Sequence, residues 1–364
     1  MYHAIDAPFI ATHCIFASCW SGALKQFWEE HMTRLISAKT ILRGATLAAA
    51  FAATLTSAAA QEITLRGASM FDENHAFTKT MERFSELVQE KYDGDVNFDL
   101  RLNGELGVEA DYVTFLQQGV AIDFTIMAPS NMATFAPSIP LMDMPFLFRD
   151  QAHWEAVLSS DVLQPLEQEL ADKADIMVIG YTGGGVRNVL ANHPIHNLNE
   201  LAGFKMRVMG APIQAQIFSA LTAAPSAISY SEVYNAIQTG VISGFENEAA
   251  SIQNLKFYEV APYLTLTRHA ITVRPIVMSG KTFRNLPAPL QAAVLEAGKE
   301  AGAYGRELES REDAEKLQEM ADAKQLTVLE FEDRDKLLEL VVPVQDAYAD
   351  SLGASDLLTS IRGM

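Results

Sequence analysis

Cysteine is almost absent from this chain of 364 residues, which has only Cys14 and Cys19. The rest of the sequence therefore has no side chains for a disulfide framework or a cysteine-ligated metal site. Positive charge is also scarce, because 27 Lys and Arg face 46 Asp and Glu, for a formal net charge of -19. This imbalance argues against nucleic acid and anionic membranes as partners, since both attract proteins mainly through Lys and Arg.

Long apolar runs are missing as well, and none reaches the roughly 18 residues of a membrane-spanning helix. Basic residues between 34 and 43 precede a short apolar run at 45–55, and small residues follow up to Ala60. This order predicts a secretory signal peptide at 32–60, cleaved after Ala60, and hence a periplasmic protein. We interpret residues 1–31 as an upstream extension from a mis-called start.

The common catalytic signatures do not occur: there is no GxSxG, HExxH or GxxxxGK[ST] pattern. The glycine run Gly183–Gly185 is not a complete GxGxxG, because Asn188 stands where the last glycine would fall, and we interpret it as a flexible domain crossover. His193 and His196 flank Pro194 and are interpreted as ordinary loop residues. We therefore expect no enzyme, no cofactor and no metal.

Hydrophobic residues make up 49% of the sequence, enough for a large core, and they follow alternating periods. Strands are predicted at "EITLRGASM", "DVNFDLRL" and "AIDFTIM", with helices ending near Tyr92 and covering 112–118. This strand-helix alternation predicts a parallel α/β sheet covered by helices.

A second α/β block follows "DIMVIGYTGGG". It has a predicted strand at 205–209 and helices at 212–221 and 231–239, the latter with Ser231 as N-cap and Gly240 at its end. The strand-like run "HAITVRPIVMS" could then return the chain to the first block. A long polar helix follows, with an apolar stripe at Leu290, Val294, Ala297, Ala301, Tyr304 and Leu308.

Two domains are predicted from the length and from this repeated crossing. We assign residues 61–184 plus 273–312 to the first domain and residues 185–272 plus 313–364 to the second. A chain that crosses twice between α/β blocks favours a hinged cleft, and such clefts commonly bind small ligands.

Polar residues stand in apolar or glycine-rich surroundings at three places. Arg207 lies within "LAGFKMRVMG" with no acid beside it, so it either faces water or receives a partner from outside the chain. Arg187 follows the glycine run, and Glu246 to Glu248 follow the apolar "VISGF". Alternatively, Glu246 caps a helix near 250, Asn247 forms a turn, and Tyr230 and Tyr234 belong to the core.

Six characteristic segments follow one another along the chain: "LNGELG", "DMPFLFRD", "GGGVRN", "NLNELAGFKMRVM", "SEVYNAIQTGVISGFEN" and "KFYEVAPYLTLTRH". In order and spacing they resemble the DctP-type substrate-binding proteins of tripartite ATP-independent periplasmic (TRAP) transporters. The resemblance covers essentially the whole chain after the predicted signal peptide. It implies a two-domain periplasmic-binding-protein-like α/β fold with hinge strands, an interdomain ligand cleft and a long domain-spanning helix.

The resemblance also implies roles for individual residues. Arg207 matches the arginine that pairs with the ligand carboxylate, Arg187 resembles a second cleft arginine, and Asn247 matches an asparagine at the same carboxylate. Tyr230 stands where an aromatic residue packs on the ligand, and Glu232 belongs to the same motif. The implied function is capture of a small organic acid for a TRAP membrane permease, by a protein that we expect to be monomeric.

The sequence departs from the family pattern at the same cleft. It reads "SGFENE" where the family commonly reads "DGQENP", which places Phe245 and Glu248 among the expected ligand-binding residues. Contacts from the first domain, with Ser69 and Asn131 among the candidates, do not assign the chain to a subgroup of the family. Two alternatives remain: an exported enzyme that acts on a sugar acid through Glu248, and a sensory solute-binding protein.

Overall fold

The computed structural model describes residues 62–364. The predicted upstream extension at 1–31 and the predicted signal peptide at 32–60 lie outside the described residues. Within the described part of the chain, no helix combines the length and the apolar character that crossing a membrane requires.

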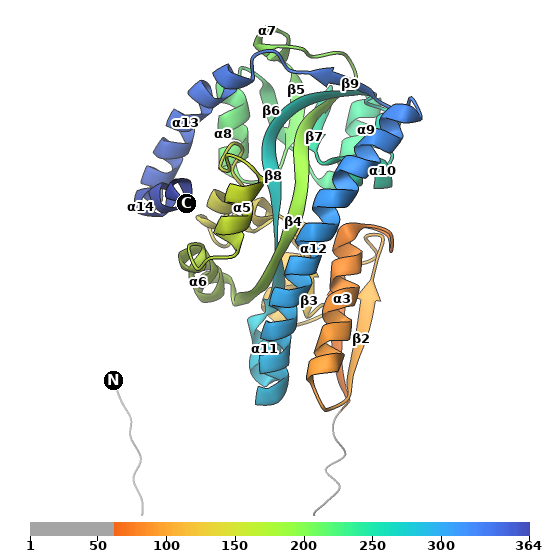
Figure 1. Cartoon of the computed structure of the whole chain (residues 1–364), viewed down its shortest axis with the longest axis vertical. Coiled ribbons are helices and arrows are strands. Elements are labelled where there is room, and N and C mark those ends of the chain that lie inside the picture. The colour runs from red at the N-terminus through yellow and green to blue at the C-terminus, as the bar shows by residue number, and fades with distance from the viewer. Residues whose placement is uncertain (1–61) are drawn as a thin grey trace, which may run out of the picture. The chain divides into compact units, whose positions relative to one another are not determined.

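One nine-stranded sheet organises the described chain (Figure 1). Its strands are β1 (Ile63–Ala68), β2 (Val96–Arg101), β3 (Phe124–Ile126), β4 (Ile176–Ala191), β5 (Lys205–Val208), β6 (Ala224–Ala227), β7 (Gly244–Asn247), β8 (Tyr263–Ser279) and β9 (Thr327–Glu330). The order is β2-β1-β3-β8-β4-β7-β5-β6, with β9 beside β8. The strands for which a parallel sheet was predicted, β1, β2 and β3, do pair in parallel. The complete sheet is mixed, because β8 runs antiparallel to β3 and β4, and β4 antiparallel to β7.

Helices flank this sheet, and most of the predicted ones are present. They are α3 (Ala76–Lys91), α4 (Glu109–Gln118), α5 (Gln151–Leu158), α6 (Gln164–Ala174), α7 (Leu198–Leu201), α8 (Pro212–Ala220), α9 (Val233–Gln238), α10 (Ala249–Asn254), α11 (Gly280–Asn285), α12 (Ala288–Asp322), α13 (Arg334–Ser351) and α14 (Ser355–Gly363). Short 3-10 turns are η1 (Pro129–Met132), η2 (Ile139–Asp143), η3 (Tyr230–Glu232) and η4 (Phe257–Glu259).

The helix predicted at 231–239 begins differently. A 3-10 turn, η3, comes first, and α9 then begins with Glu232 as its N-cap residue. Ser231 does not cap it, because its hydroxyl lies 3.1 Å from the hydroxyl of Ser229. The predicted end is correct, since Gly240 follows the helix with a φ of 75°, which suits glycine.

The glycine run lies inside β4, a strand that joins the two halves of the sheet, so it is part of a crossover but has strand structure. Gly183 and Gly184 have φ values of 115° and 124°, which only glycine adopts readily. The pairing with β8 shifts register here, and the backbone N–H groups of Gly184 and Gly185 donate to Thr272 Oγ1 at 2.8 and 3.0 Å. The run is therefore a bulge that is fastened to the neighbouring strand.

The long helix α12 packs directly on the backbone of β4. A side chain at Gly298 or Gly302 would collide with the carbonyl oxygens of Ile179 or Tyr181, so these glycines permit the close approach. The predicted apolar stripe is buried except for Tyr304, which is 40% exposed.

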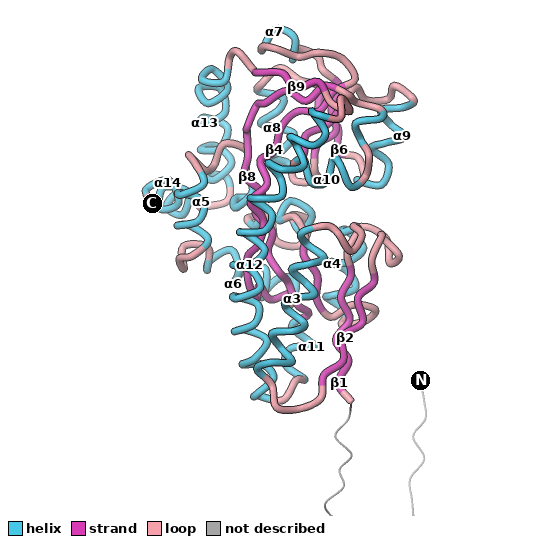
Figure 2. Tube along the Cα trace, turned by 45° about the vertical axis from the view of Figure 1, so that its right-hand side comes forward, coloured by secondary structure: helices cyan, strands magenta, loops and turns pink. Residues whose placement is uncertain are grey.

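The long strands β4 and β8 join two halves of the sheet. Beyond β8 lie β3, β1 and β2, and beyond β4 lie β7, β5 and β6. Figures 1 and 2 show α12 running beside both halves. This arrangement confirms the expected two-domain, periplasmic-binding-protein-like fold with hinge strands and a long spanning helix. The residue boundaries of the two domains stay a prediction.

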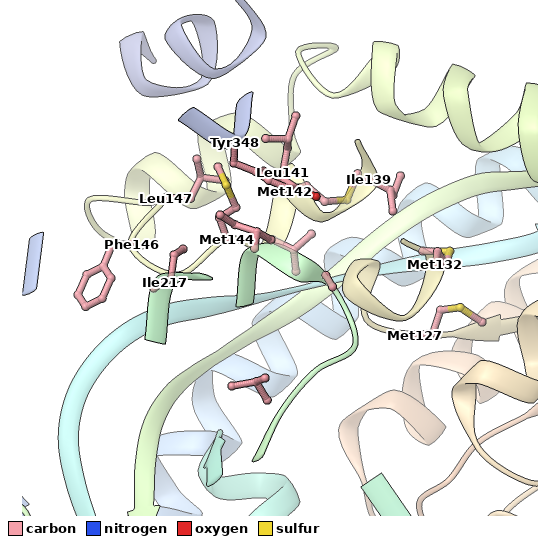
Figure 3. Close-up of a cluster of buried hydrophobic side chains, with 14 of the residues drawn as sticks. Met127, Met132, Ile139, Leu141, Met142, Met144, Phe146, Leu147, Ile217 and Tyr348 are labelled. Carbon is pink, nitrogen blue, oxygen red and sulfur yellow. The ribbon is translucent and has the colours of Figure 1, made fainter. Parts of the chain in front are cut away.

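An irregular segment between β3 and α5 supplies much of the central core. Figure 3 shows Leu141, Met142, Met144 and Leu147 near Tyr348 of α13 and Ile217 of α8, while Met127 and Met132 lie further away in the same cluster. The buried carboxyl of Asp143 accepts hydrogen bonds from the Ser130 backbone N–H and hydroxyl at 3.1 and 2.9 Å. This packing holds η1 in place, and η1 carries Asn131 to the site described next.

Candidate functional site

A cavity of about 250 Å³ lies where the two halves of the sheet meet. Its wall comes from loops and helix starts of the first half, from β5, η3 and the end of β7 in the second half, and from both long strands. Ligand cavities commonly have volumes of roughly 300 to 1,000 Å³, so this one lies just below that range and has room only for a small solute. Six of the nine predicted site residues line it: Arg187, Arg207, Tyr230, Asn247, Glu248 and Asn131.

Arg207 lies on β5 between β6 and β7, and its side chain is buried at 5% exposure. Its Nε donates to the Ile228 carbonyl oxygen at 3.0 Å, and its guanidinium carbon lies 5.2 Å from the centre of the Tyr230 ring. Within residues 62–364 no carboxylate forms an ion pair with it. Burial lowers its pKa. The alternative that Arg207 faces bulk water is therefore wrong, and within residues 62–364 its charge has no counter-ion.

Arg187 is also buried, at 4% exposure, but it has two acids of its own. Its Nε and Nη2 donate to the Glu246 carboxylate at 2.6 and 2.9 Å, and its Nη1 donates to Glu248 at 2.7 Å. His269 Nε2 lies 3.1 Å from the same Glu246 carboxylate, and burial lowers the pKa of His269. Although Glu246 is buried, the charge of Arg187 holds its pKa far below the ordinary value. Arg187 is thus held in a fixed position in the wall, and Glu246 and Glu248 already compensate its charge.

Asn247 and Tyr230 meet at the cavity, as expected. The Asn247 Nδ2 lies 2.6 Å from the Tyr230 hydroxyl, which fixes the orientation of both side chains. The Tyr230 ring packs at 5.6 Å from Phe257, and burial raises the pKa of the Tyr230 hydroxyl. The hydroxyl therefore stays protonated, and this pair offers neutral hydrogen-bonding groups beside the free Arg207.

The structure places the three other predicted residues outside the cavity wall. Phe245 is completely buried in a hydrophobic cluster, with its ring 4.5 Å from that of Phe257. Glu232 is exposed on η3. Ser69 is buried and accepts from the Phe71 backbone N–H at 3.1 Å, so its hydroxyl organises the loop whose neighbours Met70 and Phe71 do line the cavity.

Sequence reasoning missed Arg274, another arginine of the cavity wall. It lies on β8 at 4% exposure, its Nη1 donates to the Val273 carbonyl oxygen at 3.0 Å, and its guanidinium carbon lies 5.7 Å from the Phe77 ring centre. Like Arg207, it forms no ion pair with a carboxylate of the described chain. The signal was available, because Arg274 interrupts the apolar run "HAITVRPIVMS" as Arg207 interrupts its own strand.

Glu109 is a further missed residue, at the first position of α4 and on the cavity wall. Its Oε2 accepts from the Ala128 backbone N–H at 2.9 Å and from Asn131 Nδ2 at 2.6 Å. No group of three His, Cys, Asp or Glu side chains within residues 62–364 has the arrangement of a metal site. The chemistry of the cavity is therefore that of two free guanidinium groups, neutral polar groups and one separate carboxylate.

Comparisons with known proteins agree with this geometry. A solute-binding protein of Sulfitobacter sp. (strain NAS-14.1) is 78% identical over 315 residues, which are 86% of this chain and 96% of that protein. The crystal structure of a TRAP periplasmic solute-binding protein from Sulfitobacter sp. NAS-14.1, with bound α-D-taluronate, is 79% identical at a TM-score of 0.82 and covers 82% of this chain and 97% of that one.

A second TRAP periplasmic solute-binding protein from Sulfitobacter sp. NAS-14.1 was solved with bound β-D-galacturonate. It is 28% identical at a TM-score of 0.77 and covers 83% of this chain and 100% of that one. The family described as bacterial extracellular solute-binding protein, family 7, matches residues 68–351. The chain therefore belongs to this DctP family of extracellular solute-binding proteins.

Proposed function

We propose that this protein captures a hexuronate-type sugar acid in the cavity and delivers it to a TRAP-type membrane permease. The observation that carries the proposal is the buried Arg207 without a counter-ion from its own chain. A planar guanidinium with one N–H already engaged still has donors for a carboxylate, in a geometry that lysine cannot reproduce. The taluronate and galacturonate bound to the two compared structures support a sugar acid as the ligand class.

The other cavity residues complete a carboxylate-binding wall in this proposal. Arg274 supplies a second uncompensated charge, and Asn247 with Tyr230 supplies neutral hydrogen bonds and an aromatic surface. Arg187 positions this wall through Glu246 and Glu248. The first domain (61–184 plus 273–312) and the second (185–272 plus 313–364) close around the ligand by bending at β4 and β8. Ligand contacts that exist only in the closed form favour closure.

We propose binding rather than catalysis. The enzyme alternative needed Glu248 as an acid or base beside the ligand. Its carboxylate is instead engaged by Arg187 Nη1 at 2.7 Å and by the Ser251 hydroxyl, which supports a structural role in the wall. Residues 32–60 as a signal peptide, the periplasm as the site of action, a monomeric state and a permease rather than a sensory receptor as the partner belong to the same proposal.

Isothermal titration calorimetry with D-taluronate and D-galacturonate tests the proposal. We expect binding by the native protein and recovery of chemically unchanged ligand by mass spectrometry. Arg207→Lys is expected to weaken binding at least about tenfold, which corresponds to about 1.4 kcal/mol, because the paired hydrogen bonds are lost. Arg284→Lys is the matched control, since Arg284 is exposed and already paired with Asp175. The proposal fails if no sugar acid binds or if Arg207→Lys keeps the native affinity.

A further inference from the structure

One acidic side chain of the cavity wall has no part in holding a carboxylate. Glu109 is the first residue of α4 and lines the cavity together with its neighbours Val108 and Ala110. Within residues 62–364 it forms no ion pair with a basic side chain. A carboxylate without a counter-ion on the wall of an anion-binding cavity repels the ligand charge. Its presence therefore suggests a specific role in binding.

The Glu109 carboxylate is held in one orientation. Both of its hydrogen bonds, from the Ala128 N–H and Asn131 Nδ2, end on Oε2 at 2.9 and 2.6 Å. No hydrogen bond from the described residues ends on Oε1. An ionised carboxylate is only an acceptor, so the free Oε1 can satisfy a hydroxyl or amine donor of a ligand but not another carboxylate.

Glu109 and Arg207 act on each other across the cavity without touching. The negative charge of Glu109 contributes to raising the pKa of Arg207 against the effect of burial, although the two side chains form no ion pair. The cavity therefore has its free cationic groups and its free anionic group at separate places on the wall. A ligand with a carboxylate in one part and hydroxyls in another matches both.

The geometry points to Glu109 as a specificity-determining residue, which accepts hydroxyl hydrogen bonds from a sugar monocarboxylate and rejects dicarboxylates. This inference rests on the proposed function. Three arginines (Arg187, Arg207 and Arg274) and three acids (Glu109, Glu246 and Glu248) form the wall and its direct support. Their formal charges sum to zero, although Arg207 and Arg274 are unpaired within the described chain, so a monoanion can pair with a free arginine. A dianion adds a second negative charge and brings it towards a carboxylate.

Matched ligands provide the test. D-galacturonate and galactarate share the configuration of their hydroxylated carbons, but galacturonate is mainly a ring and galactarate is an open chain with a second carboxylate. The comparison therefore depends on how Glu109→Gln changes the preference, because the difference in shape is the same for both proteins. By calorimetry we expect the native protein to bind galacturonate at least roughly tenfold more tightly than galactarate, because like charges are opposed. In Glu109→Gln we expect weaker galacturonate binding, because an uncharged amide oxygen is a weaker acceptor than a carboxylate. We also expect the preference for galacturonate over galactarate to shrink to about threefold or less, because the repulsion of the second carboxylate is removed.

Glu232→Gln is the matched control, since Glu232 is exposed and lies outside the cavity wall, and its preference is expected to equal the native one. Thermal melting of each variant without ligand checks that the fold is intact. If the native protein binds galacturonate but Glu109→Gln leaves the preference unchanged, the role of Glu109 is refuted while the proposed function stands. If the native protein binds no sugar acid, the proposed function and this inference fall together.

Discussion

Glu309 is expected to make the stability of this protein fall as the pH rises. It lies on α12 and is completely buried behind the cavity, against the bulge of β4. Its Oε1 accepts from the Gly185 N–H at 3.1 Å and from the Thr272 hydroxyl at 2.7 Å. Its Oε2 has no hydrogen-bond partner within the described chain. Burial of a half-satisfied carboxyl favours its neutral form.

The charged groups around Glu309 act in both directions. Glu248 at the start of α10 and Asp313 one turn along α12 raise its pKa, and Arg274 on β8 lowers it, but burial is the largest cause. Together they raise the pKa of Glu309 from 4.5 to about 8. The folded protein therefore holds a proton at neutral pH that the unfolded chain releases.

The sign and size of the effect follow from this difference. Below pH 4.5 Glu309 is protonated in both states and costs nothing, and between pH 4.5 and about 8 only the folded state keeps the proton. At about 1.4 kcal/mol for each unit of pKa, the full loss of stability over this window is about 5 kcal/mol. Above pH 8 the loss is complete and constant.

Urea unfolding at several pH values between 5 and 8 measures the effect. Glu309→Gln keeps the shape but does not titrate, so the native protein should lose about 3 to 5 kcal/mol relative to the variant across this range. Titrating groups that do not interact with Glu309 cancel in the comparison. Glu307→Gln, at an exposed position of the same helix, should follow the native curve. Parallel curves for the native protein and Glu309→Gln would refute the reasoning.

Two further predictions concern the cavity and the hinge strand. Arg274→Gln should weaken D-galacturonate binding at least about tenfold in calorimetry, because a second uncompensated charge is lost; an unchanged affinity would mean that Arg274 does not reach the ligand. Gly184→Ala should lower the urea unfolding free energy by roughly 1 to 3 kcal/mol, because its φ of 124° is strained for alanine and the added carbon meets Ser310. Gly363→Ala, in open space, is the control, and equal stability of both variants would count against the strain.

The elements of the fold were more predictable than their pairing. The alternating apolar residues of 96–102 and the helical spacing of the long helix record local burial, which sequence periodicity reports directly. The mixed sheet was not predictable in this way, because the antiparallel pairing of β8 with β3 and β4 depends on where the chain returns in space. The burial of Gly305 beside an exposed Tyr304 depends likewise on the close approach of α12 to β4.

The candidate site was predictable where one residue conflicted with its local surroundings. Arg207 interrupts an apolar strand, and this conflict is visible without a structure. The pairing of Arg187 with Glu246 and Glu248 spans about sixty residues of sequence, so it appears only once β4 and β7 lie side by side. Glu109 was not predicted as a site residue, because acids are common at the start of helices. Only the structure shows that it lines the cavity.

The arginines of the cavity explain how, in the proposed function, a protein with a net charge of -19 can hold an anion. Charges on the surface are screened within about 8 Å at physiological salt, so the ligand responds mainly to its immediate neighbours. Arg187 is paired with Glu246 and Glu248, whereas a buried guanidinium without such a partner costs free energy. Arg207 and Arg274 carry that cost in the empty protein. A bound carboxylate relieves it, so the free energy lost by burying unpaired arginines becomes part of the free energy of binding.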